Sequence, residues 1–149
     1  MPQNLLATCA ITFALIGCNR ATTQPLNSDM TFHDAVRSTK DLPVEDSVAA
    51  VTRSLASRSI LVATEGAETA WRTSVDNEGG IWAHFYTDET ELLNAIPEGA
   101  TYAEMKFADA FSVIDTNSQF RGIQMNSASD AFYPIPRELF KQVNRELQP

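Results

Sequence analysis

The sequence predicts an α/β (α+β) fold, a single small domain with a mixed β-sheet of about five to six short strands and helices packed on it. Three observations support this class. The chain has 149 residues, which is the length of one domain. Helical and extended patterns alternate along it after residue 28. No internal repeat or low-complexity run interrupts that alternation.

Two helices are predicted at the start of the alternation. Residues 29–40 form a short helix with Met30, Phe32 and Val36 as its apolar members. The second helix has apolar residues at i, i+4, i+7 and i+11, which places them on one face. These positions are Val44, Val48, Val51 and Leu55. Pro43 suits the first turn of this helix, where a backbone amide is unpaired in any case.

Three strands are predicted in the middle of the chain. Residues 59–64 form a continuous apolar run with β-branched members, which favours a buried strand over a helix. Residues 71–76 and 81–86 flank the segment Asn77-Glu78-Gly79-Gly80. That segment predicts a hairpin turn, because glycine adopts positive φ without steric cost.

A helix is predicted over residues 87–96, directly after the hairpin. Asp88 is placed to cap this helix, and Glu91 then falls at the third helical position, as in a capping box. A strand over 101–106 follows, and the apolar spacing after it predicts a helix that begins at Phe107 and stops near Asn117.

Two strands and a helix are predicted at the end of the chain. The strands cover residues 121–126 and 131–135. Pro134 assigns the second strand to a sheet edge, because proline has no backbone N–H to donate to a neighbouring strand. Pro136 opens the final helix. The apolar face of that helix contains Leu139, Phe140, Val143 and Leu147.

Charge and cysteine content exclude several classes of protein. Eleven Lys plus Arg against nineteen Asp plus Glu give a net charge of −8. Binding to nucleic acid or to anionic lipid through a basic patch needs clustered cations, so both are disfavoured. Cys9 and Cys18 are the only cysteines. The remainder of the chain therefore has no thiol nucleophile, cysteine-ligated zinc or disulfide framework.

The first residues predict export and attachment to a membrane. Residues 5–17 are uncharged and apolar, too short to span a bilayer but of the length found in signal peptides. The segment Leu15-Ile16-Gly17-Cys18 resembles the lipobox of bacterial lipoproteins, in which cleavage precedes a lipid-modified cysteine. The resemblance implies that residues 1–17 are a signal peptide and that Cys18 is lipidated. Residues 18–28 are polar and predict a flexible tether before the domain.

The position after the cysteine bears on which membrane is involved. It is Asn19 rather than Asp, and by the same lipoprotein resemblance this implies the outer membrane, with the domain facing the periplasm. No Lys or Arg occurs in residues 1–4, where signal peptides carry positive charge. A cytoplasmic protein without lipidation therefore stays open as an alternative.

The order of elements from about residue 30 to 147 resembles the SseB-like N-terminal domain family. The stretches that carry this resemblance are Ile60-Leu61-Val62, Ile81 to Leu92, Met105 to Phe111, Ile123 to Asn126 and Ile135 to Glu138. The resemblance implies that residues 29–149 form a mixed α/β domain. It implies little chemistry, because the family as a whole has no established activity.

The strand at 81–86 carries the main candidate site. Alternation places Trp82, His84 and Tyr86 on one of its faces. Such a row offers a surface for a partner, because aromatic side chains provide contact area at low entropic cost. The alternative is that helices cover both faces of the sheet and the row is core.

Two further features have simpler explanations. The hairpin tip, residues 76–80, resembles the start of a calcium loop, but the twelfth position is Thr87, where a bidentate Glu is required. We expect a solvated turn there, which is a second candidate for a partner surface. His33, the other histidine, is expected to be a surface imidazole.

These observations favour a non-enzymatic cell-envelope lipoprotein whose SseB-like domain binds a protein or peptide partner, with no catalytic residue, cofactor or metal ion. One alternative is a small envelope hydrolase in which His84 acts as general base. A base must face a pocket and have a carboxylate or hydroxyl within hydrogen-bond reach, so the surroundings of His84 discriminate between these functions. The other alternative is a cytoplasmic SseB-like domain protein without lipidation.

Overall fold

The computed structural model describes residues 30–65 and 70–148, which contain five α-helices, a 3₁₀ turn and seven strands. The predicted signal peptide, the lipobox and Cys18 lie outside the described residues. In chain order the elements are α1 (Phe32–Ser38), α2 (Val44–Leu55), β1 (Ser59–Glu65), β2 (Ala70–Trp71), β3 (Thr73–Val75), β4 (Ile81–Tyr86), α3 (Glu89–Ala95), β5 (Thr101–Lys106), α4 (Phe107–Thr116), β6 (Phe120–Met125), β7 (Tyr133–Pro136), η1 (Arg137–Leu139) and α5 (Phe140–Leu147).

The strands form one mixed sheet, and the predicted α+β class is confirmed. The order along the sheet is β2-β1-β4-β6-β7, with β5 paired to β1 and β3 paired to β4. Every pair is antiparallel except β4 and β6, which run parallel. The prediction of an edge strand near Pro134 is confirmed, because β7 pairs with β6 alone among the described strands.

The seventh strand arises from a break that the sequence pattern does not reveal. Residues 71–76 were expected to form one strand, but the structure has β2 and β3 on either side of Arg72. The two parts pair with different strands, β2 with β1 and β3 with β4. The Arg72 amide donates to the Ala63 carbonyl at 2.8 Å, so the break is itself held by the backbone.

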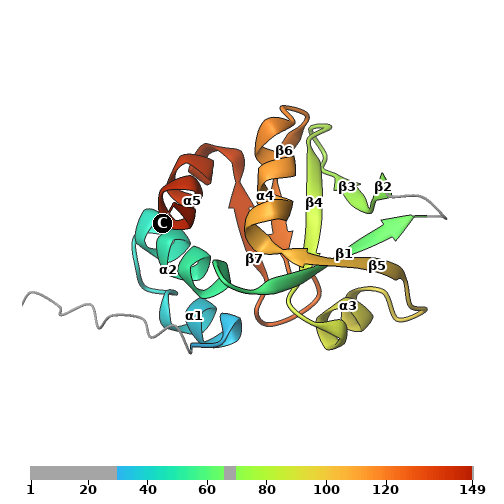
Figure 1. The fold of residues 1–149 in the computed structure, drawn as a ribbon, viewed down its shortest axis with the longest axis horizontal. Coiled ribbons are helices and arrows are strands. Elements are labelled where there is room, and N and C mark those ends of the chain that lie inside the picture. Colours follow the sequence, from blue (N-terminus) through green and yellow to red (C-terminus); the bar gives the residue numbers. More distant parts are fainter. Residues whose placement is uncertain (1–29, 66–69, 149) are drawn as a thin grey trace, which may run out of the picture.

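Most of the core lies between one face of the sheet and helices α1, α2, α4 and α5. Phe85 of β4, Phe107 and Phe111 of α4, and Phe140 of α5 form a chain of aromatic contacts with centroids 5.0–6.4 Å apart. Figure 1 shows α1, α2 and α5 gathered at one end of the molecule, with α4 crossing in front of the sheet. The N-terminal and C-terminal parts of the domain thus build the same core.

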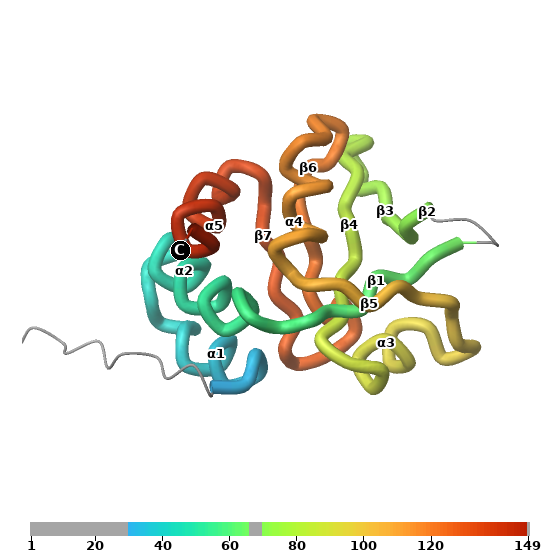
Figure 2. Tube along the Cα trace, viewed as in Figure 1, coloured from blue at the N-terminus to red at the C-terminus, as the bar shows by residue number. Residues whose placement is uncertain are grey.

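The other face of the sheet is covered by α3 alone among the described helices. A small second cluster joins Leu92 and Ile96 to Tyr86 and to Leu61 and Ala63 of β1. In Figure 2 the yellow α3 lies at one corner of the molecule, beside β1 and β5. This helix begins as predicted, because the Asp88 carboxylate accepts a hydrogen bond from the Glu91 amide at 3.0 Å. The remainder of this sheet face carries no helix among the described residues.

None of the helices in residues 30–65 and 70–148 is long and apolar enough to cross a lipid bilayer.

Candidate functional site

The predicted row on β4 is part surface and part core. Ala83 and Phe85 point into the main core, so Trp82, His84 and Tyr86 lie on the face that α3 covers only in part. Trp82 and His84 are half-buried. Tyr86 is 2% exposed, packed in the small cluster beneath α3. The exposed part of the row therefore ends at His84.

Trp82 is held against the sheet by a hydrogen bond and by a glycine. Its indole N–H donates to Asp76 Oδ2 at 2.9 Å. The parallel register of β4 and β6 places Gly122 beside it. A Cβ at Gly122 would lie 2.6 Å from the Ile135 carbonyl oxygen and would also overlap the Trp82 ring. The absence of a side chain at Gly122 thus lets the indole lie across β6.

The hairpin tip is a tight polar turn rather than a metal loop. Asp76 Oδ1 accepts hydrogen bonds from the Glu78 and Gly80 amides at 2.9 and 2.8 Å. The Trp82 indole N–H, followed by the Gly80 amide, holds the pKa of Asp76 below its ordinary value. Its oxygens are thus engaged by protein donors, and the described residues contain no cluster of three ligating side chains for a metal ion.

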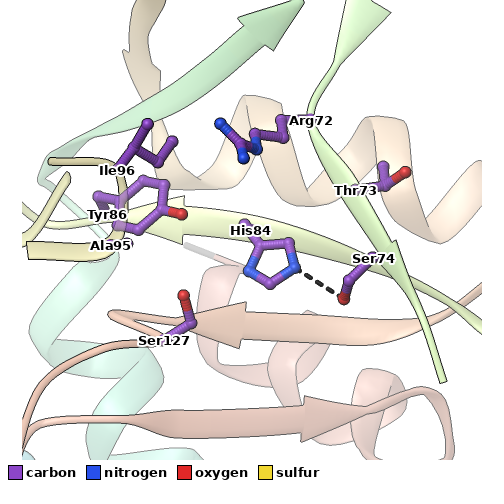
Figure 3. A pocket seen from close by; sticks show the side chains of 8 residues that line it. All are labelled: Arg72, Thr73, Ser74, His84, Tyr86, Ala95, Ile96 and Ser127. Atoms are coloured by element: carbon purple, nitrogen blue, oxygen red, sulfur yellow. Dashed lines mark hydrogen bonds between the residues drawn. The ribbon is translucent and has the colours of Figure 1, made fainter. Parts of the chain in front are cut away.

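A cavity of about 260 Å³ opens beside His84. Its polar lining consists of Arg72, Thr73, Ser74, His84, Tyr86 and Ser127 (Figure 3). Ala95 and Ile96, at the end of α3, supply its apolar wall. These residues come from the break between β2 and β3, from β3 and β4, from α3, and from the turn after β6. The cavity therefore depends on the folded sheet rather than on one local motif.

His84 and Ser74 form the central pair of the cavity. His84 Nε2 and Ser74 Oγ lie 2.8 Å apart and share a hydrogen bond, drawn as a dashed line in Figure 3. Burial, and then the positive charge of Arg72, lower the pKa of His84 from its ordinary value. The imidazole is therefore neutral at pH 7. Its Nδ1 is buried and has no hydrogen-bond partner among the described residues.

Arg72 stands out among the arginines of the described residues. Each of the other six has a side-chain hydrogen bond or ion pair. These partners are Asp130 for Arg37, Glu146 for Arg53, the Met30 carbonyl for Arg58, Asp76 and Glu78 for Arg121, four backbone carbonyls for Arg137, and Gln142 for Arg145. Arg72 makes no such contact within the described part of the chain, and no Asp or Glu lines its cavity.

The turn after β6 is anchored by Asn126, a residue for which the sequence predicted no role beyond the end of a strand. Asn126 is fully buried and has a positive φ of 49°. Its side-chain oxygen accepts a hydrogen bond from the Thr87 amide at 3.0 Å, and its Nδ2 donates to Thr87 Oγ1 at 3.1 Å. These bonds tie the end of β6 to the end of β4 and so position Ser127 at the cavity.

His33, expected to be a surface imidazole, is partly exposed and contacts a carboxylate of another helix. Its Nε2 lies 2.8 Å from Oε1 of Glu91, whose side chain is 5% exposed. The contact joins α1 to the first turn of α3. Glu91 thus contacts another helix, where the capping-box pattern had suggested only a local role. The sequence offered no signal for this pair, because the two residues lie far apart in the chain.

Sequence reasoning identified His84 but missed Arg72, Ser74 and Ser127. One available signal was the register of the predicted hairpin, in which Ser74 pairs with Trp82 and so lies diagonally next to His84. The same register, continued by one residue, places Arg72 opposite His84. No local signal identifies Ser127, since its position follows from the turn at Asn126.

Comparison with known proteins adds no relative to this picture. A scan against protein-family models, a search of curated proteins and a search of solved structures each returned no match.

Proposed function

We propose that this chain is a non-enzymatic lipoprotein of the bacterial cell envelope, anchored through Cys18 at the outer membrane, whose SseB-like domain binds a protein or peptide partner. The observation that carries the binding role is the sheet face around Trp82 and His84, which α3 leaves open. The lipobox resemblance at residues 15–18 is the support for the anchor.

The open face has the composition of a binding surface. Trp82 supplies a rigid, half-exposed aromatic side chain fixed by Asp76, and pre-ordered aromatic groups lose little entropy on binding. Gln124 lies next to His84 in the register of β4 and β6, on the same face and half-buried. The adjoining cavity adds hydroxyl groups and the cation of Arg72. Together these groups combine apolar contact with directed hydrogen bonding.

A crosslinking experiment tests this proposal in cells that carry the full chain. A photoreactive benzoyl-phenylalanine replaces Gln124 on the open face or, as a control, Val113, which is 49% exposed on α4. We expect one discrete crosslinked species from position 124 and none from position 113. The same species from both positions, or none from position 124, would contradict the proposed binding face.

The hydrolase is the second candidate, and the hydrogen bond between Ser74 and His84 favours it. A hydroxyl within 2.8 Å of a neutral imidazole at a cavity is the arrangement of an activated serine. We rank it below the binding role because no acidic residue orients His84 from its Nδ1 side among the described residues. A fluorophosphonate reagent that labels Ser74, and fails to label it in His84→Gln, would establish the enzyme and displace our first proposal.

The cytoplasmic alternative depends on the N-terminal residues alone. It predicts an intact Met1 and an unmodified Cys18 in the native protein, whereas the proposed lipoprotein begins at Cys18.

A further inference from the structure

The cavity beside His84 has the features of a site for one negatively charged group. Among the described residues that line it, Arg72 is the only charged one, and its guanidinium points into the space above His84 and Tyr86 in Figure 3. Ser74, Thr73 and Ser127 contribute hydroxyl groups that can donate hydrogen bonds. Arg72 is half-buried and has no pair among the described residues, so its guanidinium is available to a ligand.

We propose that this cavity binds the C-terminal carboxylate of a peptide, with Arg72 as its counter-ion. The inference rests on the proposed function, because it names the part of the partner that enters the site. The planar guanidinium of arginine presents two parallel N–H groups that match the two oxygens of a carboxylate. The serine hydroxyls that line the cavity can donate to the remaining lone pairs of the same two oxygens.

The balance of charge favours a carboxylate over a phosphate. Arg72 supplies one positive charge, and the neighbouring imidazole adds none because it is neutral at pH 7. The chain as a whole carries a net charge of −8. A dianion would therefore lack a second cation in the cavity and would meet repulsion from the rest of the molecule.

The size and lining of the cavity favour the end of a chain. At about 260 Å³ it lies just below the usual range of small-molecule pockets, which begins at about 300 Å³. Ala95 and Ile96 form an apolar wall that can contact a terminal side chain, and Tyr86 lies beside them. The open face leads from the cavity past His84 to Trp82. A peptide that places its terminus next to Arg72 can therefore extend along that face.

Calorimetry of the full chain in a neutral detergent tests the proposal with three small probes. Hippurate carries a carboxylate after one peptide bond and mimics a peptide terminus. Hippuramide is its neutral amide, and benzoate is a carboxylate without the peptide bond. We expect hippurate to bind at least about tenfold more tightly than either of the others, which corresponds to about 1.4 kcal/mol. Equal binding of hippuramide would overturn the carboxylate site, and equal binding of benzoate would overturn the peptide terminus as its source.

Two arginine variants locate the site. Arg72→Gln should weaken hippurate binding at least about tenfold. The control Arg37→Gln should leave it unchanged, because Arg37 lies on α1 and forms an exposed ion pair with Asp130. Unchanged binding in Arg72→Gln would overturn the assignment. If that variant does not fold, Arg72→Lys decides, because it keeps the charge but loses the paired donors and should still weaken binding.

The outcome is separable from that of the crosslinking experiment. A crosslink at position 124 without hippurate binding would leave the partner-binding face in place and remove the terminal carboxylate. Hippurate binding without the crosslink would retain the cavity and remove the larger face.

Discussion

Replacement of Asn126 by alanine should destabilise the domain by about 2–4 kcal/mol. The change removes the acceptor of the Thr87 amide and the donor to its hydroxyl. An amide left without an acceptor costs about 1–3 kcal/mol, towards the lower value here because Thr87 is half-exposed to water. The positive φ of 49° adds about 1–2 kcal/mol, since alanine adopts this conformation less readily than asparagine.

Asn126→Gly separates the two contributions. Glycine loses the same hydrogen bonds but tolerates the left-handed backbone, so it should be less destabilising than alanine by about 1 kcal/mol. Equilibrium urea unfolding followed by tryptophan fluorescence measures both variants, with Gln124→Ala, two residues earlier on β6, as the control. An Asn126→Ala protein within about 0.5 kcal/mol of the wild type would refute the reasoning, because that is the range of surface substitutions.

Four further predictions follow from the fold and the proposals. Trp82→Ala should lower the free energy of unfolding by about 1–3 kcal/mol in urea melts. Truncation of a fully buried aromatic side chain costs about 3–5 kcal/mol, and the loss should be smaller here because the indole is half-exposed. A larger loss would assign Trp82 to the core. The depressed pKa of His84 should make wild-type stability fall as the pH drops below about 6.5, the ordinary histidine value. A His84→Gln variant should lose part of that pH dependence, and identical pH profiles would contradict it. Cys18→Ala should accumulate as an unprocessed precursor by mass spectrometry, and normal processing would end the lipoprotein proposal. Residues 29–149 expressed alone should unfold in one cooperative thermal transition, since one core within this range joins the sheet to α1, α2, α4 and α5. A broad melt would contradict the single domain.

The fold was largely predictable because its elements follow local patterns. The spacing of Val44, Val48, Val51 and Leu55 gave α2, and all four belong to that helix as observed, although Val44 is 63% exposed at its first position. Glycines gave the hairpin, and Pro134 gave the edge strand. The division of the strand at Arg72 was not predictable, since it depends on which neighbour each half pairs with.

The candidate site was predictable only in part, for a related reason. Alternation placed Trp82, His84 and Tyr86 on one face, but it could not show that α3 covers Tyr86 and leaves the other two half-exposed. That outcome depends on where a seven-residue helix packs on the sheet. Arg72 and Ser127, which line the cavity beside His84, likewise come from a strand break and from a turn, and neither has a period in the sequence. Local patterns thus predicted the elements, whereas the cavity arises from how they pack.

The packing of α5 against α2 has a consequence for how this chain acquires its structure during synthesis. Phe140 and Val143, near the end of the chain, are buried in the core, and β6, which pairs with β4, begins only at Phe120. A chain that emerges from its N-terminus therefore leaves part of the apolar faces of α2 and β4 uncovered until residues 120–143 have been made. The native state is therefore reached late, which is what the export proposed above requires of a chain that passes unfolded through a translocation pore.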